Sequence, residues 1–265
     1  MSSDFAVITE EFGEDLDAIR VLVSAFDGPP KEAAKPRIAA ANSATLLLAA
    51  TFEEFVREMA RAYARAVVAA TQSVEKLPPN LAGTAWRRTM EMLARVRVDT
   101  TVEAFAAHAV SEAQSRFNAV YEFCRGDLSQ DVYKELIHND NNMRPREINS
   151  LFKVSALSDV CSKISDKQAI FELFGETEPE KAHGLLLSGI NEFIERRNSV
   201  AHSLILNKSS GPDQILKDID LLSAFGKALC ETLESLKQRE AEAPAGGGEM
   251  VGAPDNPEHA RPSDT

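Results

Sequence analysis

The sequence has little of several features that mark common classes of protein. Its three cysteines, Cys124, Cys161 and Cys230, are odd in number and show no C-x-x-C spacing, which excludes a disulfide scaffold and a cysteine-based zinc site. The longest mainly apolar run, from Ala44 to Ala50, is far shorter than the ~20 residues that span a bilayer. The first four residues, MSSD, carry no basic charge, unlike a secretory signal. We therefore expect a cytoplasmic protein with no membrane segment.

Positive charge is also scarce. The chain has 29 lysines and arginines against 41 acidic residues, a net charge of −12, which argues against a broad nucleic-acid-binding surface. Part of this excess lies at the end of the chain, where the residues after position 241 carry five acids and one arginine. The rest of the chain is therefore less acidic than the total suggests, and a small local basic site is compatible with it.

Strand-like alternation, Gly-rich phosphate loops, nucleophile elbows and H-E-x-x-H motifs are absent from the sequence. Apolar residues instead recur at three- and four-residue steps, which predicts an all-α fold, a bundle with long antiparallel helices. We expect helices over about 13–26, 36–74, 81–96, 102–123 and 215–238, a long helix that starts at Pro179, and a short helix that begins at Arg144. The predicted organisation is an N-terminal helical extension (1–36), a helical domain (37–238) and a disordered acidic tail (239–265) rich in proline and glycine.

The segment from Glu195 to His202, near the end of a long predicted helix, groups Arg197, Asn198 and His202 within one and a half turns. Asn198 and His202 are four residues apart and point the same way on an ideal helix. Arg197 and His202 are five apart and diverge by roughly 140°. This divergence indicates a broad site, such as a groove between two helices or two subunits.

These residue types suit the cleavage of RNA without a metal. Histidine can take a proton from a 2′-hydroxyl or give one to the leaving 5′-oxygen, because its unperturbed pKa of ~6.5 lies near neutrality. Arginine can donate two hydrogen bonds to one phosphate and stabilise its developing charge. The alternative is structural: a surface arginine pair, Arg196 and Arg197, followed by a histidine at the end of a helix.

The cluster resembles the R-x(4–6)-H signature of HEPN domains, in which a polar residue follows the arginine. Two other segments are similar to the RiboL-PSP-HEPN type: residues 46–55, where an aromatic and a glutamate follow small residues, and residues 142–152 in the middle of the chain. The resemblance covers roughly residues 37–237. It implies an all-helical HEPN-like bundle, a homodimer with a composite cleft, and metal-independent endoribonuclease activity in toxin–antitoxin, anti-phage or stress defence.

The resemblance also implies roles for individual residues. Arg197 and His202 match the two signature positions, and Asn198 matches the polar position between them. Glu53 or Glu54 lies where an acidic residue of the early helix is expected, and Arg196 is a second, supporting arginine. The expected products are a 2′,3′-cyclic phosphate and a 5′-hydroxyl, with no cofactor and no metal ligand.

Some features are left open by the sequence. HEPN toxins inactivated by tyrosine modification carry a tyrosine two residues after the histidine, whereas this chain has Leu204, so that control is not expected here. The expected partners are RNA, a second copy, and an antitoxin or nucleotidyltransferase. The alternative function is a non-catalytic HEPN module that binds nucleotide, RNA or a protein partner.

Other candidate residues have structural explanations as well. Glu53 and Glu54 also fit a solvated helix face, and Arg144 and Arg146 could contact RNA or simply begin a helix. Trp86, flanked by two arginines, could stack on a base or pack in an interface.

Overall fold

The computed structural model describes residues 3–27, 34–71, 73–97, 103–139, 141–202 and 210–242. Within these ranges the chain forms ten α-helices and one short 3-10 helix, and no strand. The elements are α1 (Asp4–Asp27), α2 (Ala34–Ala70), η1 (Val74–Lys76), α3 (Leu81–Ala94), α4 (Glu103–Cys124), α5 (Tyr133–Leu136), α6 (Pro145–Lys153), α7 (Val160–Ile164), α8 (Gln168–Phe174), α9 (Pro179–His202) and α10 (Pro212–Glu242).

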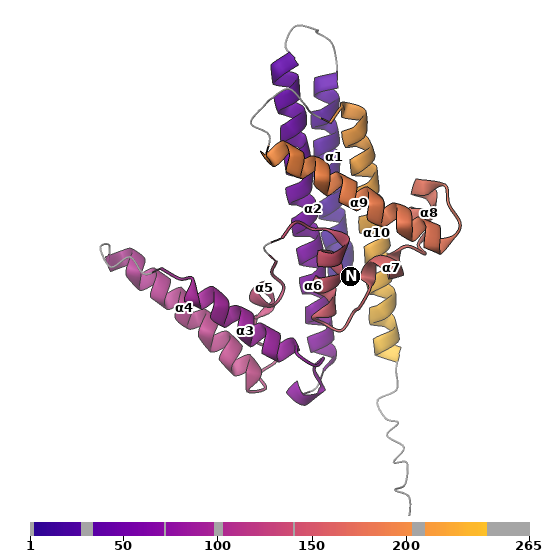
Figure 1. Ribbon diagram of the computed structural model, residues 1–265. Helices are drawn as coiled ribbons and strands as arrows, with labels where there is room; N and C mark the ends of the chain where they lie inside the picture. The colour runs from indigo at the N-terminus through magenta and orange to yellow at the C-terminus, as the bar shows by residue number, and fades with distance from the viewer. Residues whose placement is uncertain are drawn as a thin grey trace, which may run out of the picture.

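Three long helices, α1, α2 and α10, pack side by side and form the centre of the molecule (Figure 1). The rings of Phe12 in α1 and Phe55 in α2 stack with their centroids 4.0 Å apart. Phe52 of α2 meets Phe225 of α10 edge-on at 5.3 Å. Gly226 lets α10 approach closely, because a Cβ there would lie 3.1 Å from the Phe12 ring. These aromatic contacts join all three helices into one core.

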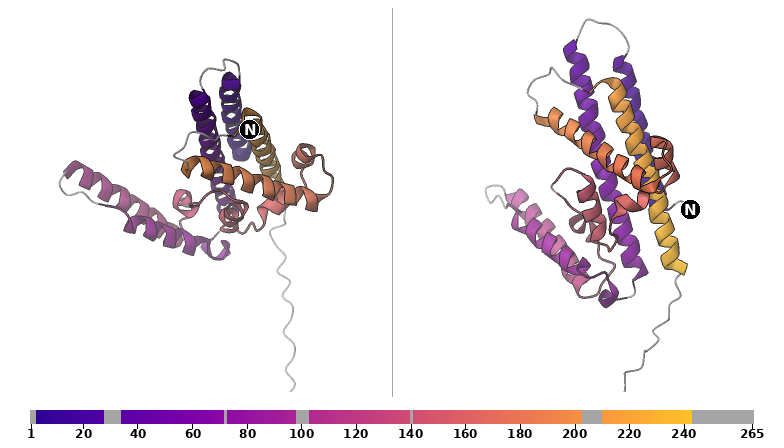
Figure 2. Two further views of the ribbon diagram at one scale, coloured as in Figure 1. Left: turned by 45° about the horizontal axis from the view of Figure 1, so that its top comes forward. Right: turned by 45° about the vertical axis from the view of Figure 1, so that its right-hand side comes forward.

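Helix α9 crosses the three-helix bundle, and the short helices α6, α7 and α8 pack nearby (Figures 1 and 2). Its apolar residues recur at three- and four-residue steps, which makes one face of the helix apolar. The ring of Phe193 in α9 meets Phe52 of α2 edge-on, with centroids 6.4 Å apart. The bundle therefore fixes the position of α9 through a buried aromatic contact.

Helices α3 and α4 form a hairpin, here called the arm, that projects from the side of the bundle (Figures 1 and 2). The arm meets the rest of the molecule mainly where α3 packs against α5. Three aromatic residues of the arm, Trp86, Phe117 and Tyr121, are about two-fifths exposed. The arm is thus less fully packed than the bundle.

The all-α bundle expected from the sequence is confirmed. The predicted starts of the helices at 81 and 179 coincide with those of α3 and α9. The first helix begins earlier than expected, at Asp4, because Phe5 and Phe12 extend its buried stripe. The expected disorder of the tail falls on residues 239–265, of which those after 242 lie outside the described residues. Among the described helices, none has a stretch both long and apolar enough to cross a membrane.

Candidate functional site

The candidate site lies on the last turns of α9. The apolar stripe of this helix, Leu186, Ile190, Phe193 and Ile194, is fully buried, which fixes one face against the bundle. Beyond Ile194 the residues are half-buried or exposed. The sequence of α9 therefore presents the Arg196–His202 turns at the surface of a helix whose middle turns are firmly packed.

Arg196 turns toward α10 and forms an ion pair with Asp218. Its Nε donates to Asp218 Oδ2 at 3.2 Å and its Nη2 donates to Oδ1 at 2.5 Å, while Gln214 Nε2 donates to Oδ1 at 3.1 Å. The Asp218 side chain is only 3% exposed. Burial raises the pKa of Asp218, against the opposing effect of the hydrogen bonds from Arg196 and Gln214. Arg196 is thus engaged in joining α9 to α10.

Arg197, the next residue, has no carboxylate partner among the described residues. Its Nη1 donates to Asn198 Oδ1 at 3.2 Å, and the same oxygen accepts a hydrogen bond from Asn142 Nδ2 at 3.1 Å. A guanidinium has five N–H donors, so this one bond leaves most of them available. Arg197 can therefore still donate two parallel hydrogen bonds to a phosphate.

The segment before α6 docks onto α9 beside this site. Asn142 contacts Asn198, as above, and the Nη2 of Arg144 donates to Glu195 Oε1 at 2.7 Å. The Nη1 of Arg144 also donates to Asn191 at 3.3 Å, whereas Arg146 is exposed. Arg144 therefore serves to hold the segment in place. Asn142 is the one member of the site that the sequence signature does not contain, although it lies in the middle segment that resembles the family.

His202 is the last residue of α9, and its side chain is exposed. Among the described residues no hydrogen bond or ion pair reaches its ring. It is not bonded to Arg197, in agreement with the roughly 140° that separates two positions five residues apart on a helix. The ideal-helix angle therefore predicts that, within one chain, the imidazole and the guanidinium do not face one small pocket.

The two glutamates expected on the early helix are engaged with arginines of α2. Glu54 forms ion pairs with Arg57 at 2.9 Å and Arg61 at 3.0 Å. Burial acts to raise the pKa of Glu54, but the two arginines outweigh it and leave the pKa below its ordinary value. Glu53 lies 3.9 Å from Arg57 through Oε2, and its other oxygen is buried without a hydrogen bond. In the described residues, neither carboxylate bonds to Arg197 or His202.

The remaining candidates lie elsewhere. Trp86 faces Phe117 on the arm, with ring centroids 6.1 Å apart, and His138 is half-buried beside the loop after α5. His183 shares a hydrogen bond of 2.9 Å with Ser165. No group of three or more His, Cys, Asp or Glu with metal-binding geometry occurs within the described ranges.

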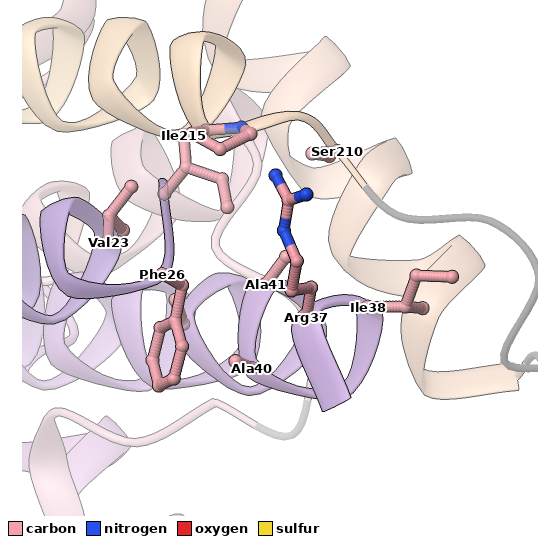
Figure 3. Close-up of a pocket in the computed structure, with 10 residues that line it drawn as sticks. Val23, Phe26, Arg37, Ile38, Ala40, Ala41, Ser210 and Ile215 are labelled. Carbon is pink, nitrogen blue, oxygen red and sulfur yellow. The ribbon is translucent and has the colours of Figure 1, made fainter. Parts of the chain in front are cut away.

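An apolar cavity of about 210 Å³ opens where α1, α2 and the start of α10 meet (Figure 3). Its walls include Val23, Phe26 and Ile215, and the guanidinium of Arg37 points across it toward Ser210. None of the residues of the α9 cluster lines this cavity. It is therefore separate from the candidate site.

Comparison with known proteins gives a single informative result. No curated protein and no solved structure shows significant similarity to the chain. The family model RiboL-PSP-HEPN, in contrast, matches residues 10–235, which include α9 and most of α10. The match covers well over half of the chain, and the protein therefore belongs to the RiboL-PSP-HEPN family.

Proposed function

We propose that the protein is a metal-independent endoribonuclease that acts as a homodimer, with Arg197, Asn198 and His202 as its site. The observation that carries the proposal is the contrast between neighbouring cations at the end of α9. Arg196 and Arg144 are paired with carboxylates, whereas among the described residues Arg197 bonds only to the amide of Asn198. A guanidinium with no carboxylate partner in the described part of the chain, on the same helix end as an exposed imidazole, is suited to bind an external phosphate.

In this proposal, the reaction uses only proton transfer and charge stabilisation. His202 takes the proton of the ribose 2′-hydroxyl, and the 2′-oxygen forms a bond to phosphorus. The bond from phosphorus to the 5′-oxygen breaks, and a protonated imidazole, the partner's His202, donates a proton to that oxygen. Arg197 holds the phosphate and neutralises its developing charge. The products are a 2′,3′-cyclic phosphate and a 5′-hydroxyl.

The need for a second copy follows from the geometry of a single chain. Each chain supplies one His202 at the end of α9, while the reaction uses both a base and an acid. Arg197 and His202 also point in different directions on their own helix. Two α9 ends placed around a two-fold axis would bring the guanidinium of one copy toward the imidazole of the other.

Asn198 is proposed to position Arg197 and the RNA backbone. Its side-chain oxygen accepts from both Arg197 and Asn142, which leaves its amide N–H groups to point elsewhere. This arrangement would preorganise the guanidinium before substrate binds. Supporting roles of Glu53, Glu54 and Arg196 would be indirect, through the packing of α2 and α10.

The experiment is cleavage of single-stranded RNA by purified protein in excess EDTA. We expect His202→Ala to lower the rate by about 10²-fold or more, the usual contribution of a general acid or base. His108→Ala is the matched control, because His108 is an exposed histidine of α4 far from α9 in sequence. The new ends should carry a cyclic phosphate and a 5′-hydroxyl. Full activity of the His202 variant, or a strict requirement for metal, would rule the mechanism out.

A second candidate is a non-catalytic module that binds nucleotide, RNA or protein through the same surface. It is favoured by one observation: no carboxylate among the described residues orients His202. Overexpression in a host cell separates the two, because a free nuclease arrests growth and a binding module does not. A toxin or defence role further predicts an adjacent gene for an antitoxin or a nucleotidyltransferase.

A further inference from the structure

The apolar cavity at the end of α1 and at the starts of α2 and α10 reaches from the core to the surface (Figure 3). Val23, Ala44 and Ile215 line it and are buried in the core. Phe26 lines it as well, but its side chain is 38% exposed. Apolar surface of this kind favours the binding of an apolar molecule, because burial removes it from water. A cavity with such walls is therefore a candidate ligand site.

Arg37 is the one charged side chain among the described residues that line this cavity. Its guanidinium points across the cavity toward Ser210 (Figure 3). It forms no hydrogen bond or ion pair with any other residue that the structure describes. A guanidinium has five N–H donors and no acceptor. The donors of Arg37 that face the cavity can therefore bind the anionic group of a ligand.

The charge of the cavity differs from that of the chain. No acidic residue is found among the described lining residues, although the whole chain carries a net charge of −12. An anion at this position would meet the Arg37 cation and no carboxylate of the wall. A guanidinium binds a carboxylate through two parallel hydrogen bonds, and apolar surroundings strengthen that attraction. The lining therefore selects a molecule with an apolar body and a carboxylate head.

The volume of the cavity limits the size of the apolar body. A dry cavity of about 150 Å³ in a protein core accommodates benzene, which has about six heavy atoms. In proportion, the 210 Å³ of this cavity accommodates about eight carbon atoms. Each buried methylene group raises affinity by about fourfold. The length of the ligand should therefore be visible directly in its affinity.

We propose that this cavity binds an aliphatic monocarboxylate with a chain of about eight carbon atoms. The chain would lie against the core residues of α1, α2 and α10, and the carboxylate would accept hydrogen bonds from Arg37. A bound ligand would thus contact the ends of three helices at once. None of the residues of the α9 cluster lines the cavity. The inference therefore goes beyond the proposed RNA cleavage and does not depend on it.

The test is isothermal titration calorimetry of the full chain with sodium octanoate, and with hexanoate and decanoate as a shorter and a longer chain. We expect one octanoate per chain, bound about tenfold or more tightly than hexanoate, because two further methylene groups are buried. Decanoate should gain less than about fourfold over octanoate, since its last carbon atoms extend beyond the cavity. An affinity that rises by the same factor at both steps would indicate adsorption to an open surface and would overturn the inference.

Arg37→Gln separates the carboxylate from the chain. We expect it to weaken octanoate binding by about tenfold or more, in line with the loss of hydrogen bonds between charged groups, and to leave the binding of octan-1-ol unchanged. Lys35→Gln is the matched control, because Lys35 is an exposed cation of the same helix that does not line the cavity. This control should change octanoate affinity by less than about twofold.

A second variant tests the walls of the cavity. Ala41 is a half-buried residue of α2 that lines it, and Ala41→Leu would occupy part of its volume. This variant should weaken octanoate and octan-1-ol alike, while circular dichroism checks that the helices are retained. Equal octanoate affinity in Arg37→Gln and the unmodified protein would overturn the inference. So would octan-1-ol that binds the unmodified protein as tightly as octanoate, or the absence of octanoate binding.

Discussion

Two neighbouring arginines of α9 have different kinds of partner, although they are adjacent in the sequence. Arg196 and Arg197 are adjacent in α9, yet the roughly 100° between successive residues gives them different partners, and Arg196 turns toward α10. Arg196 meets a buried carboxylate, whereas Arg197 meets only the amide of Asn198. The comparison shows how one step along a helix separates a cation paired with a buried carboxylate from one that has no carboxylate partner among the described residues.

The difference is energetic as well as geometric. Asp218 is almost fully buried, and a buried carboxylate without a partner destabilises the folded state strongly. No comparable penalty follows from the loss of Arg197, because its partner among the described residues is the neutral amide of Asn198. Substitutions at the two positions should therefore separate stability from activity.

The largest expected effect is on stability, from Arg196→Ala. Removing the guanidinium leaves Asp218 buried with the Gln214 amide but without its cation. This should lower the free energy of unfolding by about 3 kcal/mol, the lower end for a broken buried ion pair, because Arg196 is partly exposed. Urea unfolding followed by circular dichroism measures it. Arg20→Ala is a suitable control, since Arg20 of α1 pairs at the surface with Asp220 of α10. The loss of this exposed ion pair should lower the free energy of unfolding by less than about 1 kcal/mol. Equal losses in the two variants would contradict a special role for Asp218.

Arg197→Ala should have the opposite profile. We expect unfolding to change little, while RNA cleavage falls by about 10²-fold, as for the loss of one preorganised charge donor. Arg197→Lys should restore only part of the rate, because an ammonium cannot donate two parallel hydrogen bonds to a phosphate. The rates are measured under single-turnover conditions. A large loss of stability without a specific loss of cleavage would reverse the assignment of the two arginines.

A mixing experiment tests whether the site is shared between copies. Unmodified protein and the His202→Ala variant are mixed in equal amounts, so that half of the dimers carry one His202 and lack either the base or the acid. Random exchange in a two-fold dimer should leave about a quarter of the activity of the unmodified protein, from the dimers that keep both histidines. The measurement is cleavage after the two proteins are unfolded and refolded together. Retention of about half of the activity would mean that each copy works alone and would exclude a shared site.

Much of this arrangement could be predicted from the sequence, and the reasons are local. The stripe of Leu186, Ile190 and Phe193 predicts the buried face of α9, because helical periodicity depends only on spacing. The signature spacing likewise predicts where Arg197 and His202 lie on the helix.

The partners of these residues could not be predicted. Asp218 is 22 residues from Arg196 and Asn142 is 56 residues from Asn198, and no periodic pattern specifies which side chains meet across a fold. Glu54 illustrates the same limit, because its ion pairs lie within α2 although its position in the sequence suggested the site. The sequence thus predicted the helix that carries the candidate site, while tertiary packing determined which of its arginines pair with a carboxylate in the described residues.

The smallest expected effect concerns pH. Burial raises the pKa of Asp218 above its usual value of 3.8, so between these two values the folded protein holds a proton that the unfolded chain has released. Stability contributed by this group is therefore highest below pH 3.8 and falls as the pH rises through the raised folded pKa. Asp218→Asn removes the titration but also weakens the bonds to Arg196. The measured quantity is therefore a difference: the free energy of unfolding of the native protein minus that of this variant. This difference should decline between pH 3.8 and the raised folded pKa. The decline is at most about 1.4 kcal/mol for each pH unit between the folded and unfolded pKa values. Urea unfolding at a series of pH values from about 3 to 6 measures the slope, and a difference that rises with pH would show that Arg196, not burial, controls this carboxyl group.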